Sequence, residues 1–321
     1  MSASSASKKR KLAVVGFGGN ALLRPEDRGT QEEQIARAKQ AARWLAEIVR
    51  HDYKMIVVHG NGPQVGNILV QAEEASTKIP PQTLDVAVAQ TEGSMGFMLQ
   101  QAIRNRLHAI GLGGEVATVL TEVEVDPNDI AFKRPTKPIG PFFTRYRAEA
   151  LERDYGWTMK EDSGRGWRKV VPSPKPQHIL NINTIAHMLD AASVVIAAGG
   201  GGIPVVRGRD GQWRGIEAVI DKDFASAVLA AELEADIYIV LTGVAKVAID
   251  FGKPTERALD RMTVAEAEQH LAEGQFPPGS MGPKIEASVQ FVKASGKDVL
   301  ITDVENLREA LEGKDGTLIV P

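Results

Sequence analysis

The chain alternates between short apolar runs and longer segments in which apolar residues recur every three or four positions. The runs at 12–15, 55–58, 193–198 and 237–242 contain almost no polar residue, as is typical of strands buried on both faces. Between the first two runs, residues 30–50 carry apolar side chains at helical spacing with charged residues between them. Strands that alternate with amphipathic helices predict an α/β fold with a mostly parallel central sheet covered on both faces.

Further elements follow from the same patterns. Apolar spacing predicts a helix over 84–105 and another over 224–234. Residues 116–125 alternate between β-branched and acidic residues, which predicts one exposed strand. Near the end of the chain, a helix is expected to begin around 278–284 and to run to about 294. After it, short strands at 299–302 and 317–320 flank a short helix at 305–311.

The character of the chain changes between about residues 126 and 176. Proline, glycine, aromatic and basic residues become dense there, and the periodic pattern stops. A structureless loop of this length is improbable inside a compact domain. We therefore expect an inserted subdomain, or lid, within a single domain that spans 11–321. Residues 1–10 are rich in Ser, Ala and basic residues and predict a disordered tail.

Composition restricts the possible functions. The 321 residues are 43% hydrophobic and 25% charged, as in a globular protein with a large core. A formal net charge of −3 gives no reason to expect a nucleic-acid or membrane-surface partner, and no apolar run is long enough to cross a membrane. The absence of cysteine excludes disulfides and fits a cytoplasmic protein.

Three of the predicted strands end in glycine-rich turns, at 16–20, 59–66 and 199–202. Such turns allow backbone N–H groups to approach an anion without a side chain in the way. In parallel sheets ligands bind beyond the carboxyl ends of the strands, where these turns would gather. A single turn of this kind is as often a tight connection without a ligand, but the repetition favours an anion site.

Three lysines stand in unusually constrained settings. Lys137 lies between prolines, Lys222 lies between Asp221 and Asp223, and Lys284 follows a Gly-Pro pair at a predicted helix start. Phosphoryl transfer requires positioned donors and cations around the transferring group, and little covalent chemistry from the protein. The two aspartates either orient Lys222, contact a magnesium ion, or only cap the following helix.

Other chemistries find little support. The turn at 16–20 is neither a Walker loop nor a spaced dinucleotide fingerprint. A dinucleotide-binding oxidoreductase would have a second strand that ends in an acidic residue about 20 positions later, but the sequence predicts a helix there. The six histidines show no paired spacing for zinc, and no Gly-x-Ser-x-Gly elbow is present.

Seven long motifs together resemble the carbamate kinases of the amino acid kinase superfamily. The motifs cover 18–22, 59–66, 135–143, 164–174, 199–206, 217–223 and 279–286. The resemblance implies a three-layer αβα sandwich with a small protruding subdomain, an acceptor-binding half at about 11–215 and a nucleotide-binding half at about 216–321. It also implies a homodimer that transfers phosphate reversibly between carbamoyl phosphate and ADP, giving carbamate and ATP, with Mg²⁺.

The resemblance also assigns roles to individual residues. Lys137 and Lys222 would neutralise transition-state charge, Asp221 would orient the lysines, and Lys284 would reach the nucleotide phosphates. Residues of the first two turns would hold the transferring phosphate and the acceptor, namely Gly18, Gly19, Asn20, Gly60, Asn61 and Gly62. Residues of the later motifs would bind the nucleotide, namely Gly199, Gly200, Thr242, Gly243, Ala248, Met281 and Gly282. The metal ligands are left open.

The sequence departs from the family pattern in two regions. In the nucleotide wall, Gly243, Ala245 and Ala248 replace two acids and an aromatic residue. Glu92 stands where the family tends to carry Gln, and an extra carboxylate in the acceptor pocket would disfavour a small anion. Two alternatives therefore stay open: a kinase of the same fold with another small amine or amino-acid-type acceptor, and a non-catalytic phosphate-binding homologue that has lost its nucleotide.

Overall fold

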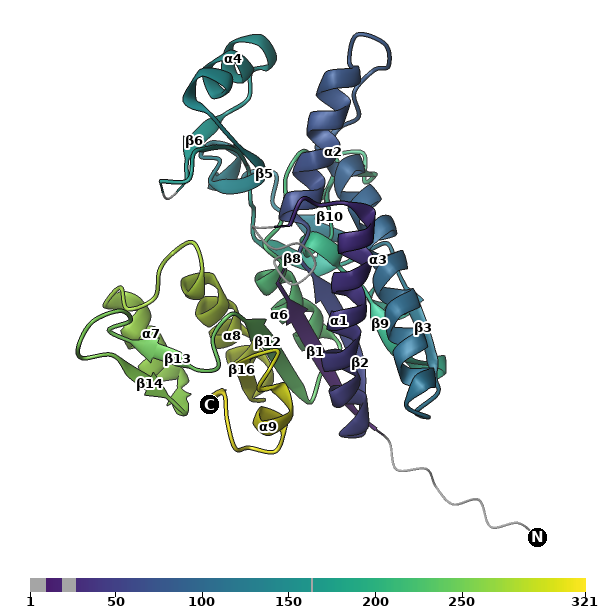
Figure 1. Cartoon of the computed structure of the whole chain (residues 1–321), viewed down its shortest axis with the longest axis vertical. Helices are drawn as coiled ribbons and strands as arrows, with labels where there is room; N and C mark the ends of the chain where they lie inside the picture. Colours follow the sequence, from purple (N-terminus) through teal and green to yellow (C-terminus); the bar gives the residue numbers. More distant parts are fainter. Residues whose placement is uncertain (1–9, 19–26, 163) are drawn as a thin grey trace.

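A computed structural model describes residues 10–18, 27–162 and 164–321 (Figure 1). The predicted disordered tail therefore lies almost wholly outside the described residues, as do Gly19 and Asn20. The centre of the molecule is an eight-stranded sheet. Its strands, in spatial order, are β15 (Arg261–Thr263), β17 (Thr317–Val320), β16 (Val299–Asp303), β12 (Ile237–Thr242), β1 (Lys11–Phe17), β2 (Tyr53–His59), β9 (Ala192–Ile196) and β3 (Glu115–Thr118). All neighbouring pairs are parallel except β16 with β17.

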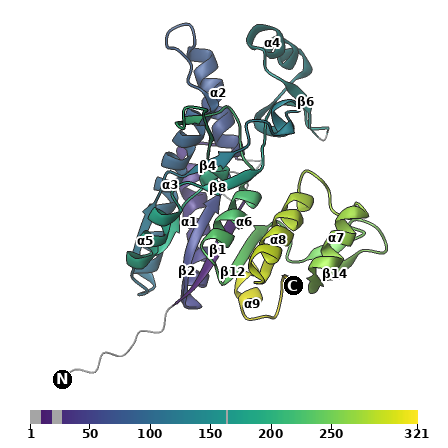
Figure 2. The same cartoon turned by 180° about the vertical axis from the view of Figure 1, so that it is seen from behind.

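Helices cover both faces of this sheet (Figures 1 and 2). On one face lie α1 (Gln31–Arg50), α3 (Leu84–Ala109) and α9 (Leu307–Leu311), and on the other lie α5 (Ile182–Ala191), α6 (Lys222–Glu232) and α8 (Met281–Ser295). Alternate residues of β1 enter the two cores, with Val14 on the α6 side and Val15 on the α1 side. This is the predicted three-layer αβα sandwich with a mostly parallel sheet.

Smaller sheets stand around the main one. One contains β11 (Trp213–Gly215), β10 (Ile203–Arg207), β4 (Glu122–Val125) and β8 (Pro176–Ile179). A two-stranded hairpin, β13 (Val247–Ile249) with β14 (Arg257–Leu259), lies with α7 (Val264–Ala272) on the side of α8 away from β1 (Figures 1 and 2). The third contains β5 (Lys137–Phe143), β7 (Trp167–Val171) and β6 (Met159–Glu161).

The sheet of β5, β7 and β6 carries α4 (Arg145–Tyr155) and protrudes beyond the main sheet beside α2 (Gly62–Ala75) (Figure 1). It has a small core of its own, built from Ala148, Leu151 and Met159. Two glycines allow it to approach α2, because a Cβ on Gly66 would lie 1.9 Å from the Cα of Gly140. The protruding subdomain therefore docks on α2 through direct backbone contact.

The prediction of one exposed strand over 116–125 is wrong. The stretch forms two strands in different sheets, β3 at the edge of the main sheet and β4 in the four-stranded sheet. Val116 and Val123 are both buried, because each faces a different core. The helix expected from residue 224 begins two residues earlier, at Lys222, because Asp221 caps it.

Candidate active site

The first two glycine turns lie side by side at the carboxyl ends of β1 and β2. The amide N–H of Gly60 donates to the carbonyl oxygen of Phe17 at 2.9 Å, which ties the ends of the two strands together. Gly18 follows β1 at this point, and a Cβ built on it would meet no atom of the described residues within 4 Å. An anion cradle requires that side chains leave such space open. The other two residues predicted for this turn, Gly19 and Asn20, lie outside the described residues.

The third glycine turn packs against the second. Asn61 is buried and its Nδ2 donates to Thr91 Oγ1 at 2.8 Å. Gly200 has a φ of 70°, and a Cβ there would lie 2.1 Å from Asn61 Nδ2. A Cβ on Gly199 would lie 2.3 Å from His59 Nε2. The residues predicted for the nucleotide at 199–200 therefore contact the acceptor turn that contains Asn61 and Gly62, and their role toward a nucleotide stays a prediction.

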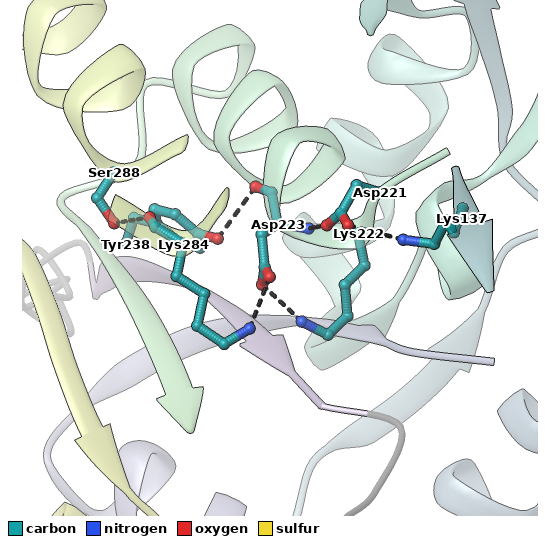
Figure 3. Close-up of polar contacts among 7 residues, drawn as sticks. All are labelled: Lys137, Asp221, Lys222, Asp223, Tyr238, Lys284 and Ser288. Carbon is teal, nitrogen blue, oxygen red and sulfur yellow. Dashed lines mark hydrogen bonds and ion pairs between the residues drawn. The ribbon is translucent and has the colours of Figure 1, made fainter. Parts of the chain in front are cut away.

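Beside these turns, the three predicted lysines are joined through two aspartates (Figure 3). Lys137 Nζ donates to Asp221 Oδ2 at 2.7 Å. Lys222 Nζ donates to Asp223 Oδ1 at 2.5 Å, and Lys284 Nζ donates to the other oxygen of Asp223 at 2.7 Å. The structure thus brings residues 137, 222 and 284 into one polar cluster, which we call the lysine cluster together with Asp221 and Asp223.

Each member of the lysine cluster is placed by the start of an element. Asp221 is the N-cap of α6 and accepts from the amide of Asp223 at 2.9 Å. Lys284 lies in the first turn of α8, and Lys137 is the first residue of β5. Behind the cluster, the hydroxyl of the buried Tyr238 donates to the carbonyl oxygen of Asp223 at 3.1 Å. Helix N-termini favour negative charge, so α6 and α8 add to the attraction for a phosphate.

The charges in the lysine cluster do not balance, because three ammonium groups face two carboxylates. Burial disfavours the charged carboxylate of Asp223, but Lys222 and Lys284 outweigh this and hold its pKa below the usual range. Burial lowers the pKa of Lys222, with Lys284 acting in the same direction. For Lys284, the attraction of Asp223 overcomes burial and raises the pKa. The net positive charge is therefore concentrated where an anion would have to bind.

Beneath the third turn lie two buried groups with unsatisfied atoms, Glu92 and His59. Glu92 accepts from the amide of Thr121 at 2.8 Å, while its Oε1 has no partner among the described residues. Burial raises the pKa of Glu92 well above its usual value, and burial lowers the pKa of His59 to about 4. His59 is therefore neutral near pH 7. Burial disfavours the ionised form of Glu92, and its expected effect on a small anion stays a prediction.

The predicted nucleotide residues outside the turns lie on the α8 side of the sheet. Thr242 ends β12 and Gly243 follows it, with no atom within 4 Å of a Cβ built on Gly243. Ala248 lies in β13, opposite Ala258 of β14. Met281 and Gly282 form the first turn of α8, next to Lys284. The contact of these residues with a nucleotide stays a prediction.

Sequence reasoning assigned the orientation of the lysines to Asp221 and missed Asp223 as the residue that joins two of them. Asp223 is 3% exposed and binds both Lys222 and Lys284. The Asp-Lys-Asp spacing was a visible signal, but it was equally compatible with helix capping. In the described part of the chain, no group of three or more His, Cys, Asp and Glu residues could hold a metal ion, and none of the helices there is long and apolar enough to cross a membrane.

Comparison with known proteins agrees with this geometry. The family model described as the amino acid kinase family matches residues 11–303. The chain belongs to the amino acid kinase family. It is 44% identical to a carbamate kinase of Pyrococcus furiosus, over 97% of this chain and 99% of the relative. It is 49% identical to carbamate kinase 1 of Enterococcus faecium, over 92% of this chain and 94% of the relative.

A solved structure of the family has the same overall arrangement. Carbamate kinase from Giardia lamblia bound to AMP-PNP superposes with a TM-score of 0.89 at 38% identity, covering 97% of this chain and 98% of that one. This amino acid kinase therefore shares its whole fold, and not only isolated motifs, with an enzyme that binds an ATP analogue.

Proposed function

We propose that this amino acid kinase transfers phosphate reversibly between carbamoyl phosphate and ADP. The observation that carries the proposal is the lysine cluster, in which Lys137, Lys222 and Lys284 meet beside the glycine turns. An arrangement of cations with backbone N–H groups beneath them suits a transferring phosphoryl group, whose charge is spread over its equatorial oxygens. Relatives that share up to 49% identity over almost the whole chain bear the name carbamate kinase.

In the proposed reaction, an oxygen of the terminal phosphate of ADP forms a bond to phosphorus as the bond from phosphorus to the carbamate oxygen breaks. The products are ATP and carbamate. Lys137 and Lys222 approach the transferring group from the protruding subdomain and from α6, and Lys284 approaches from α8, toward the nucleotide phosphates. Gly18, Gly60 and Asn61 belong to the turns that would hold the phosphate and the acceptor.

Mg²⁺ is part of the proposal as a companion of the nucleotide. Asp221 and Asp223 are already paired with lysines. The described residues therefore offer no dedicated metal cage, which fits an ion held mainly by substrate phosphates and water. When bound, Mg²⁺ would neutralise phosphate charge.

We also propose a homodimer located in the cytoplasm. On the described surface, Phe97 of α3 is 60% exposed and Val86 of the same helix is 45% exposed. Exposed apolar side chains on one helix support an association surface. Light scattering coupled to size exclusion tests the assembly, and a monomer at micromolar concentration would refute it.

The direct test is an assay of ATP formation from carbamoyl phosphate and ADP, with and without Mg²⁺. We expect saturable turnover, and Lys222→Ala should lower it by about a hundredfold or more, as the loss of one preorganised donor does elsewhere. Lys297→Ala removes an exposed lysine outside the cluster and should retain full activity. A Lys222→Ala variant within about tenfold of the parent would remove Lys222 from the catalytic residues. Turnover with another amine or amino-acid-type acceptor, but not with carbamate, would overturn the choice of substrate.

A further inference from the structure

A cavity of about 390 Å³ lies between the protruding subdomain and the main body. Helix α2 and the loop that follows it form one wall, and β7 with the segment before β6 forms the other (Figure 1). Its polar and aromatic lining includes Glu73, Trp157, Lys169 and Glu217. No member of the lysine cluster and no residue of the glycine turns lines this cavity, so it is separate from the proposed active site. Its volume is within the range of small-molecule sites.

Two charged residues of the lining, Lys169 and Glu217, are open to a ligand. Lys169 Nζ lies 4.1 Å from the centre of the Trp157 ring. Within the part of the chain that the structure describes, Lys169 and Glu217 form no ion pair and no side-chain hydrogen bond. Glu217 is exposed to solvent and Lys169 is half-buried, so two opposite charges on one cavity wall remain accessible to a ligand.

Glu73 adds a buried acceptor. One of its oxygens, Oε1, accepts from Arg147 Nη2 of α4 at 2.9 Å. The other, Oε2, has no partner among the described residues, although the side chain is only 4% exposed. This oxygen has almost no accessible surface, so a ligand in the cavity cannot reach it, and burial raises the pKa of Glu73.

The protonation of Lys169 fits a role in binding. Burial lowers its pKa to about 8, while Glu217 and Glu73 act in the opposite direction. The side chain is therefore mostly charged near pH 7. The Trp157 ring stabilises this ammonium, and apolar residues such as Leu69 and Val170 complete the walls.

We propose that the cavity binds a small zwitterion carrying one ammonium and one carboxylate group, as a free amino acid does. The carboxylate of the ligand pairs with Lys169, and its ammonium pairs with Glu217. The remainder of the ligand packs against Leu69 and Val170. A simple amine would leave Lys169 unpaired, and a simple carboxylate would leave Glu217 unpaired.

The position of the cavity links it to the protruding subdomain. Val171 lines the cavity and lies directly opposite Lys137 in the pairing of β7 with β5. A ligand in the cavity would therefore contact the strand that is paired with the one carrying Lys137.

Isothermal titration of the full chain with a panel of free amino acids, without nucleotide or carbamoyl phosphate, tests the proposal. We expect at least one amino acid to bind at millimolar concentration or below. Its decarboxylated and deaminated analogues should bind at least about tenfold more weakly, as isopentylamine and isocaproate would for L-leucine. Failure of every amino acid to bind, or equal binding of the amine, would overturn the proposal.

Variants locate the binding site. Lys169→Met and Glu217→Gln should each weaken binding about tenfold or more. Lys78→Met and Glu74→Gln change nearby exposed residues that do not line the cavity, and should leave binding unchanged. An amino acid that binds the Lys169 and Glu217 variants as tightly as the parent occupies another site, and the proposal is then wrong. Because this experiment measures binding alone, its result is independent of the proposed phosphate transfer.

Discussion

Lys137 donates a hydrogen bond to Asp221 at 2.7 Å, although the two residues are 84 positions apart in the sequence. Lys137 belongs to the protruding subdomain and Asp221 caps α6. This contact helps to hold the subdomain against the main body. The ion pair of Arg147 with Glu73 and the backbone contact of Gly66 with Gly140 act in the same way. The position of a proposed catalytic lysine therefore depends on how the subdomain docks.

The first prediction concerns Asp223, which joins Lys222 to Lys284. Asp223→Asn keeps the size of the side chain but leaves two neighbouring ammonium groups without their shared carboxylate. We expect the free energy of unfolding to fall by about 3–5 kcal/mol, as for other broken buried ion pairs, and turnover to fall with it. Urea unfolding and the ATP-formation assay measure the two effects. Asp298→Asn, at an exposed position, is the control. Stability within about 1 kcal/mol of the parent would show that Asp223 is not the residue that holds the cluster.

The second prediction concerns the backbone contact between α2 and β5. In Gly66→Ala the new methyl group would lie 1.9 Å from Gly140 Cα, so the subdomain has to shift. Displacement of Lys137 should lower kcat by about tenfold or more, since catalysis is sensitive to small misplacements. Gly93→Ala is the matched helical control, because its methyl group meets no atom within 4 Å. Steady-state kinetics with circular dichroism distinguish displacement from unfolding, and a fully active Gly66→Ala enzyme would contradict the docking argument.

The third prediction concerns the altered nucleotide wall. Ala248→Tyr together with Gly243→Asp restores the residue types that the family pattern has at these positions, and the space beside Gly243 admits the new side chain. We expect tighter binding of ADP, since an aromatic contact adds about 0.5–1.5 kcal/mol beyond area burial. Calorimetric titration measures the affinity. Ala258→Tyr, directly opposite Ala248 on the neighbouring strand, is the control. Unchanged ADP affinity in the double variant would mean that these positions do not contact the nucleotide.

The fourth prediction concerns pH. The pKa of His59 is lowered to about 4 in the fold from 6.5 in the unfolded chain. Between pH 6.5 and about pH 4, His59 binds a proton in the unfolded chain but not in the folded one. The free energy of unfolding is therefore highest above pH 6.5 and decreases as the pH falls below it. At about pH 5 the loss amounts to about 2 kcal/mol.

The comparison with His59→Asn isolates this effect. The variant removes the titrating ring while other acidic groups remain, so the parent should lose about 2 kcal/mol more than the variant between about pH 8 and pH 5. Urea unfolding at the two pH values measures the difference. If the free energy of unfolding decreases equally in the two proteins, the pKa of His59 is not lowered in the folded state.

Periodicity was sufficient to predict the layers of this fold, because strands buried on both faces and amphipathic helices have distinct patterns. It also predicted that the glycine turns gather, since the carboxyl ends of parallel strands share one edge. It failed over 116–125, where alternation is the same whether a stretch forms one strand or two. The sheet to which each half belongs is decided by distant partners, β9 for β3 and β8 and β10 for β4.

The lysine cluster was predictable only in part. The constrained settings of Lys137, Lys222 and Lys284 selected these residues, the motif resemblance assigned their roles, and the structure brings them together. The sequence could not show that Asp223 binds two of them, because this depends on where α8 lies relative to α6. Glu92 was expected to act as a charge, and its burial beneath Gly199, which raises its pKa, could not be predicted from the sequence.

The uneven number of charges in the lysine cluster has a consequence for the order of events. If the protruding subdomain swings away and takes Lys137 with it, two ammonium groups remain opposite two carboxylates. The charges of the remaining lysines and aspartates then cancel, and the site attracts a phosphate only weakly. Capture of the substrate and docking of the subdomain would thus reinforce one another, and the enzyme would release its product by lifting a single side chain out of the cluster.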